Sequence, residues 1–245
     1  QKGRLLIMEL SESTLQVLRN FSGINQNLLI KSGSNIKTIS EARNVVATAD
    51  VTESFEKDFG IYDLNEFIGV MGLVDTPSLK FDEDFVTVSD SSGRSKVKYF
   101  YAAEETLTTP TKDVTMPEAD VKFVLDNDTL NKLKKAASTL GHSEVSIRAK
   151  DGILSLSVVE NQNATSNAFS IDIDGEFKQD AVFNFIISIS NLKILPGDYE
   201  VEISSKLITQ FKNKEVPLRY WIALEKTSTY GVWHVRKFKP TKRPC

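Results

Sequence analysis

Two stretches of this chain, one in each half, make the same transition from a strand into a short helix. The second, residues 183–199, reads FNFIISISNLKILPGDY: a continuous apolar run, a short amphipathic turn and a Pro-Gly-Asp stop. The first, residues 61–74, reads IYDLNEFIGVMGLV and passes from an aromatic strand end through polar residues into a short helix. Two related segments in one chain indicate an internal duplication, so the fold must be built from two similar modules.

Each of the two segments carries its own helix signals. In the first, Asp63 can cap a helix by accepting a backbone N–H, and apolar residues follow at helical spacing: Leu64, Phe67, Ile68 and Met71.

In the second segment Ser188 or Ser190 is expected to cap a helix in the same way. Leu192 and Ile194 are expected to be buried, and Pro196-Gly197 to end the helix. The duplication therefore predicts two short helices in each half.

Composition narrows the class of protein. With 245 residues, 40% hydrophobic and 26% charged, the chain can bury one large core or two of ordinary size. The only cysteine is Cys245, so no disulfide can form within the chain, a usage typical of a reducing cytoplasm. We find no signal peptide and no long apolar run, which predicts no membrane span. A formal net charge of −3 argues against a protein that grips many phosphates, although a local basic surface is compatible with it.

The first half is predicted to consist of a helix, a strand meander, a second helix and a second meander. Ser11 or Ser13 can cap the first helix, which should bury Leu15, Leu18 and Phe21 and end at Gly23. Strands are predicted at residues 27–31, 35–39, 43–51, 54–61, 78–82, 85–89 and 96–102.

The second half repeats this order after a linker. Residues 103–120 contain several Thr and Pro residues and little periodicity, which predicts an extended segment. A strand at 121–125 then leads to Asp126–Asp128, which can cap a helix ended by Gly141. That helix should bury Leu130, Leu133, Ala137 and Leu140. Further strands are predicted at 144–149, 153–159, 168–173, 181–185, 199–204, 207–211 and 219–224.

These elements place the predicted domains at 8–102 and 121–230, with 1–7 and 231–245 outside them. Purine-rich codons could encode Lys2-Gly3-Arg4, so we expect natural translation to start at Met8. The end of the chain carries five basic residues, Arg236, Lys237, Lys239, Lys242 and Arg243. They could touch nucleic acid, or the segment could be an unstructured end without a role.

Residues 61–74, 183–199 and the near-terminal YWIALE resemble the DNA polymerase sliding clamp, or processivity factor, of T-even-type bacteriophages. The resemblance covers about residues 8–230. It implies an α+β fold of duplicated clamp domains in a ring of three subunits, with antiparallel sheets outside and two short helices per domain lining the hole. It also implies partners: duplex DNA held without sequence preference, a replicative DNA polymerase and a clamp-loader ATPase, in the cytoplasm of an infected bacterium. No cofactor is implied.

A ring that slides on DNA needs a weakly basic inner surface, because many strong phosphate contacts would slow it. On the predicted helices, the basic residues that lie off the buried stripe are Arg19, Lys132, Lys134, Lys135 and Lys193. The resemblance makes them the candidates to face DNA; without it, solvated basic side chains on ordinary amphipathic helices would be the preferred explanation. The helix over residues 64–74 departs from this pattern, since it has no Lys or Arg and carries Asp63 and Glu66.

The resemblance also implies an outer pocket that captures short apolar peptides of replication proteins. Tyr220, Trp221 and Ile222 lie beside each other in a strand, so either Trp221 or its two neighbours face outward. Trp221 can equally be a core residue. Subunits of a clamp meet through edge strands, for which residues 96–102 and 168–173 are the candidates.

Enzymatic readings find little support. His142 and His234 are the only histidines, no cysteine lies near them, and Gly152, Gly175 and Gly197 occur in turns rather than in a phosphate-binding loop. The acidic runs at 82–84 and 172–176 match no ion-binding spacing, so no metal site is predicted. The alternative to a clamp is a duplicated, β-rich phage structural or assembly protein that binds only protein.

Overall fold

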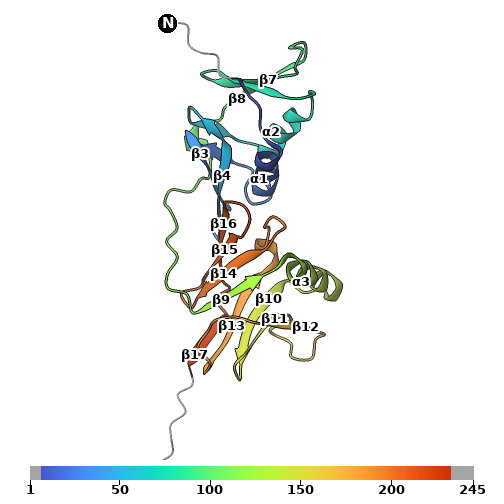
Figure 1. Cartoon of the computed structure of the whole chain (residues 1–245), viewed down its shortest axis with the longest axis vertical. Helices are drawn as coiled ribbons and strands as arrows, with labels where there is room; N and C mark the ends of the chain where they lie inside the picture. Colours follow the sequence, from blue (N-terminus) through green and yellow to red (C-terminus); the bar gives the residue numbers. More distant parts are fainter. Residues whose placement is uncertain (1–6, 233–245) are drawn as a thin grey trace, which may run out of the picture.

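The computed structural model describes residues 7–232. Residues 1–6 and 233–245, including most of the predicted N-terminal extension and the five basic residues near the C-terminus, lie outside this part. The molecule is elongated, with the two halves of the chain stacked end to end (Figure 1). Within residues 7–232 the three α-helices lie on one side, and the segment that joins the halves runs along the opposite side.

The first half follows the predicted order of helix, meander, helix and meander. Its elements are β1 (Ile7–Met8), α1 (Glu12–Ser22), β2 (Leu28–Ile30), β3 (Gly33–Ile39), β4 (Val45–Phe55), β5 (Phe59–Ile61), α2 (Leu64–Met71), β6 (Ser78–Phe81), β7 (Phe85–Ser89) and β8 (Lys96–Phe100).

The joining segment contains one 3-10 turn, η1 (Glu104–Thr106), and is otherwise irregular. The second half consists of β9 (Val121–Leu125), α3 (Asn127–Leu140), β10 (Glu144–Lys150), β11 (Ile153–Val158), β12 (Phe169–Ile173), β13 (Ala181–Ser188), the 3-10 turn η2 (Ile189–Asn191), β14 (Tyr199–Ser204), β15 (Ile208–Asn213), β16 (Leu218–Ala223) and β17 (Thr229–Val232).

The two halves share the same order of strands from β1 to β8 and from β9 to β16, which confirms the duplicated α+β fold. The first half contains a sheet of order β1-β6-β7-β8, and the second half repeats it as β9-β14-β15-β16. In the same way β3 and β4 pair in the first half as β11 and β12 pair in the second. By this correspondence β16 is the counterpart of β8, and β12 is the counterpart of β4.

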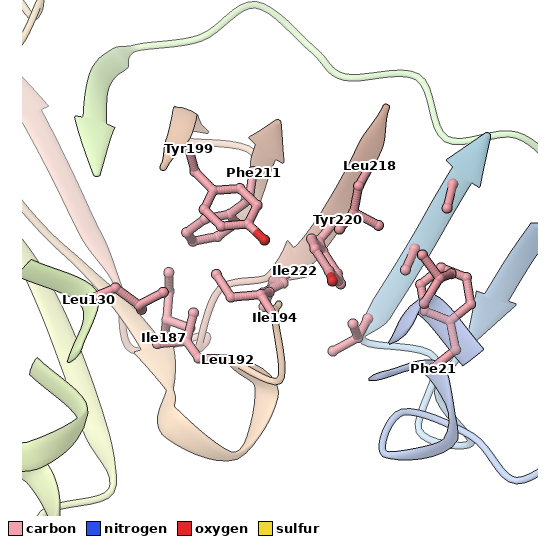
Figure 2. Close-up of a cluster of buried hydrophobic side chains, with 14 of the residues drawn as sticks. Phe21, Leu130, Ile187, Leu192, Ile194, Tyr199, Phe211, Leu218, Tyr220 and Ile222 are labelled. Atoms are coloured by element: carbon pink, nitrogen blue, oxygen red, sulfur yellow. The ribbon is translucent and has the colours of Figure 1, made fainter. Parts of the chain in front are cut away.

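One ladder joins the halves into a continuous structure. β16 pairs antiparallel with β4, from Leu218 opposite Ala49 to Ile222 opposite Val45, and so forms a six-stranded sheet of order β3-β4-β16-β15-β14-β9. Buried side chains from both halves meet beneath it: Phe21 of α1 belongs to the same cluster as Leu218 and Tyr220 of β16 (Figure 2). The junction is therefore both hydrogen-bonded and packed.

The three α-helices begin where the sequence predicts, because each has a capping side chain. Ser11 Oγ accepts from the Thr14 N–H at 3.2 Å, Asp63 Oδ1 from the Glu66 N–H at 3.1 Å, and Asp126 Oδ1 from the Thr129 N–H at 2.7 Å. α3 ends at Gly141, which adopts the left-handed conformation with φ 70°. Of the apolar residues expected to be buried in these helices, Leu15, Ile68 and Leu140 are only half-buried.

The predicted fourth helix, within residues 183–199, is wrong. Only the single turn η2 forms there, and the Ser188 side chain does not cap it but lies 2.8 Å from the Ser190 hydroxyl. Leu192 and Ile194 are buried as expected, yet exposed Lys193 lies between them, which is the alternation of extended chain. Pro196 disfavours helix at the residue before it, and the segment between β13 and β14 is shorter than its counterpart between β5 and β6.

Candidate nucleic-acid interface and partner surfaces

The helix side of the molecule holds the predicted DNA-facing residues. Lys132 and Lys135 are exposed on α3, and Lys134 is half-buried, so burial lowers the pKa of its ammonium group. Arg19 is exposed on α1, but its Nη1 lies 2.8 Å from Glu12 Oε1, and both side chains are more than half exposed. An exposed pair of this kind is held weakly, so the guanidinium remains accessible to another anion.

Lys193 occupies a different setting, at the junction between the halves. Its Nζ donates to the Gly23 carbonyl at 3.0 Å, and its own carbonyl accepts from Asn20 Nδ2 at 3.0 Å. Asn20 Oδ1 accepts in turn from the Tyr220 hydroxyl at 2.6 Å. Lys193 therefore connects the second half to the end of α1, although its side chain is exposed.

The expected pocket role of Tyr220 and Ile222 is wrong. Both side chains are 0% exposed, because they point into the core beneath the six-stranded sheet. Alternation places Trp221 on the opposite face, where it is half-buried and its Nε1 donates to Gln210 Oε1 at 2.9 Å. Of the three predicted residues, only Trp221 can line a surface that a peptide reaches.

Two apolar side chains that sequence reasoning missed lie in line with Trp221. Trp221 is opposite Val46, and Val46 is opposite Ile39, so the three form a row across β16, β4 and β3. Val46 is half-buried like Trp221, whereas Ile39 is buried. The joining segment lies on this face, because Asp113 Oδ1 is 2.5 Å from Lys37 Nζ, and Lys37 shares the face of Ile39. A groove of ≈ 380 Å³ separates this segment from β2 and β3, with Leu29, Thr109 and Pro110 in its walls.

The two strands predicted for subunit contact both lie at sheet edges. β8 ends the order β1-β6-β7-β8, and β12 ends the order β12-β11-β10-β13-β17. β8 exposes Lys96 and Lys98, whereas β12 exposes Asp172. The apolar side chains of β12, Phe169, Ile171 and Ile173, remain half-exposed, whereas β4 buries Val45, Ala47 and Ala49 beside β16.

Electrostatics in the described part reveal one buried carboxylate that the sequence did not single out. Burial by itself would raise the pKa of Glu53, but hydrogen bonds from the Ser11 N–H at 2.6 Å and from the Thr14 hydroxyl outweigh it, and the net pKa is lowered. Glu53 lies on β4 and is 8% exposed. It therefore holds the start of α1 against the junction strand.

Within residues 7–232 no group of three or more His, Cys, Asp or Glu side chains is arranged to hold a metal ion. His142 Nε2 lies 2.6 Å from the Asn167 carbonyl and has a structural partner. No helix of this part is long and apolar enough to cross a bilayer.

Solved structures share the whole architecture. The proliferating cell nuclear antigen (PCNA) of Entamoeba histolytica matches 89% of this chain and 98% of its own, with a TM-score of 0.65 and 12% identity. That of A. fulgidus, solved with the C-terminal region of FEN-1 bound, matches 90% of this chain and 97% of its own, with a TM-score of 0.66 and 15% identity. The duplicated halves, the helices on one side and these likenesses define the fold as that of a DNA clamp.

Sequence comparisons narrow the class further. A family model described as "DNA polymerase processivity factor" matches residues 11–109, and one described as "gp45 sliding clamp, C terminal" matches residues 118–226. The sliding clamp of Vibrio phage KVP40 is 35% identical over 223 residues, covering 89% of this chain and 99% of the relative. That of Escherichia phage RB69 is 30% identical, covering 91% and 99%. The chain therefore belongs to the phage sliding-clamp family, whose members are polymerase processivity factors and not enzymes.

Proposed function

We propose that three copies of this chain close into a ring around duplex DNA and tether a replicative polymerase in the cytoplasm of an infected bacterium, after a separate clamp-loader ATPase opens the ring. The observation that carries the ring is the junction inside the chain. β16 pairs with β4, and their counterparts β8 and β12 are both free edges. The same contact can therefore form between copies, with β8 of one copy against β12 of the next.

Charge and polarity support this head-to-tail contact. Exposed Lys96 and Lys98 of β8 would oppose the strand that carries exposed Asp172, while Val97 and Tyr99 would meet the half-exposed apolar face of β12. Because the two strands differ, the contact is heterologous and must close into a ring to leave no free edge. Three subunits with two clamp domains each, at 8–102 and 121–230, would supply six domains.

Light scattering across a concentration series tests the ring directly. We expect a species of three subunits that dissociates on dilution. Val97→Asp on β8 should shift the protein to monomer, since it introduces a charge at the strand contact, whereas Val182→Asp, at an exposed position inside a sheet, should not. A wild-type protein that stays monomeric at every concentration would contradict the ring proposal. It would favour a protein that binds other proteins without encircling DNA.

For DNA, we propose that Lys132, Lys135, Arg19 and Lys134 give the inner side its positive charge, with Lys193 contributing at the domain junction. Their number is small, as sliding requires. Rings loaded on nicked circular DNA should be retained at moderate salt and lost when the DNA is linearised. Lys132→Gln should shorten retention on linear DNA without changing the number of subunits.

For partners, we propose that a short apolar peptide of the polymerase docks beside the joining segment on Val46 and Trp221, the half-buried end of the row that continues to buried Ile39. An aromatic anchor in such a row suits peptide capture. Trp221→Ala should abolish stimulation of the polymerase while three subunits still assemble. Ile153→Ala is the control, because it truncates an exposed apolar side chain in the β10–β11 hairpin, which is not part of this row. Equal loss in both variants would contradict this placement of the peptide.

A further inference from the structure

α2, the helix without a basic residue, lies directly beside the free edge strand β8. The Tyr99 hydroxyl of β8 donates to the Asp63 carbonyl at 3.3 Å, and the Tyr99 and Phe67 ring centroids are 5.3 Å apart. Burial raises the pKa of Tyr99, and the nearby Glu66 carboxylate raises it further. Glu66 is exposed and directly precedes Phe67 on α2, so it lies close to the edge that another copy would meet.

The junction between β4 and β16 inside the chain indicates which helices would meet at a β8–β12 contact between copies. There, the end of α1 touches the extended segment after η2: Asn20 bonds to Tyr220 and to the Lys193 carbonyl, and Lys193 Nζ donates to Gly23. The segment after η2 is the counterpart of α2. Across a β8–β12 contact, the equivalent approach is between the end of α3 in one copy and α2 in the next.

The residues of α3 at this approach follow from its alignment with α1. Both helices are capped by a side chain that accepts from the N–H of a threonine three residues later, Thr14 in α1 and Thr129 in α3. Counting from these caps, STLQVLRNF in α1 matches DTLNKLKKA in α3. Lys135 then takes the place of Asn20, and Ala136 takes the place of Phe21.

A bulkier element in the next copy would compensate for the smaller Ala136, which takes the place of Phe21. Phe21 is fully buried at the junction inside the chain, whereas the smaller Ala136 is half-exposed. At the junction inside the chain, the end of α1 meets only the extended segment after η2, but the end of α3 would meet the full helix α2 of the next copy, with Leu73 70% exposed at its end. Leu73 is apolar and lacks cover within this copy.

The charges of α2 and α3 are also complementary. Between Asp58 and Leu79 the chain has no Lys or Arg and carries Asp63, Glu66 and Asp75, while α3 carries three lysines. We propose that α2 is a subunit-contact helix, which packs its exposed side against the Lys135–Ala136 face of α3 in the next copy and brings Glu66 to Lys135. The proposal rests on the ring proposed above and names the contact on its inner side.

Charge reversal tests this pairing by sedimentation equilibrium of the full chain. Lys135→Glu and Glu66→Lys should each weaken subunit association about 3- to 30-fold, because each replaces attraction by repulsion at a partly exposed contact. The double variant should return association to within about threefold of wild type, since the pair is restored with its signs exchanged. Raising salt should reduce each of these differences.

Lys132→Glu is the matched control, since it makes the same charge change one turn earlier on α3. It should leave association nearly unchanged. Ala136→Phe should weaken association without lowering the thermal midpoint of the dissociated protein, because Ala136 is half-exposed within one copy.

Two results would overturn the inference while the ring stands: an effect of Lys135→Glu equal to that of Lys132→Glu, or a double variant no better than the single ones. A wild-type protein that never associates would overturn the ring, and the helix contact with it. Different results would therefore contradict the helix contact alone and the ring proposal as a whole.

Discussion

The Tyr220 hydroxyl joins the two halves of the subunit, and its removal should measure how strongly they are coupled. Tyr220 is 0% exposed; its hydroxyl donates to Asn20 Oδ1 at 2.6 Å and accepts from the Leu195 N–H at 3.1 Å. Tyr220→Phe keeps the aromatic ring and its packing but removes both hydrogen bonds, so that Asn20 Oδ1 and the Leu195 N–H each lose a partner. The substitution therefore isolates the hydrogen bonds from the apolar contacts.

The expected loss follows from the burial of the two orphaned groups. A fully buried donor or acceptor without a partner costs about 1–3 kcal/mol, and because both groups here are only partly buried, we expect a total of about 2 kcal/mol. Asn20→Ala should cost a similar amount, since it also removes the bond to Lys193. The double variant should lose less than the sum, by roughly 0.5–1.5 kcal/mol, because the two residues share one bond.

Urea unfolding at fixed protein concentration measures these differences. Tyr230→Phe is the control: this ring stacks on Phe183 at 6.0 Å, and its hydroxyl makes no hydrogen bond within residues 7–232. It should change the free energy of unfolding by less than about 0.5 kcal/mol. A Tyr220→Phe loss as small as that of the control, or strictly additive effects of Tyr220→Phe and Asn20→Ala, would refute the reasoning.

Three further variants probe single features by the same assay. Glu53→Gln should destabilise the protein by roughly 1–3 kcal/mol at neutral pH. The lowered pKa of Glu53 means that the carboxylate stabilises the fold above its unfolded pKa of about 4.5 and that this is lost as pH falls through the lower folded value, so the difference between variant and wild type should shrink in acid. Gly60→Ala should cost about 1–3 kcal/mol, since its Cβ would lie 2.5 Å from the Ala102 carbonyl oxygen, while Gly231→Ala, with no heavy atom within 4 Å, should be nearly neutral. Gly141→Ala should cost about 1 kcal/mol because φ is 70° there; a neutral result in any of the three would contradict its stated cause.

Local signals predicted the helices that have local causes. Ser11, Asp63 and Asp126 each cap the helix that follows them, since the bond that fixes the helix start lies within three residues. The same approach failed after Ser188. Burial of Leu192 and Ile194 alone does not distinguish a helix from extended chain, and the connection to β14, which is shorter than that between β5 and β6, favours the extended form.

Contacts between distant strands were beyond the reach of the sequence. Alternation showed that Trp221 and its neighbours face opposite sides, but only the core beneath the six-stranded sheet decides which side is buried. Ile39 and Val46 could not be grouped with Trp221, because nothing local predicts that β4, which pairs with β3 of its own half, also pairs with β16 of the other half. Glu53 was missed for the same reason, since its partners precede it by about forty residues.

The ladder between β4 and β16 has a mechanical consequence for a ring of three copies. Each copy would contribute one strand junction inside its chain and one to its neighbour, so the closed ring would contain two kinds of joint. The joints inside a chain are spanned a second time by residues 103–120, which run along the side opposite the helices (Figure 1). A subunit cut within that segment would still be held together by its sheet, and a ring pulled apart would separate at β8 and β12, where no peptide chain crosses the joint.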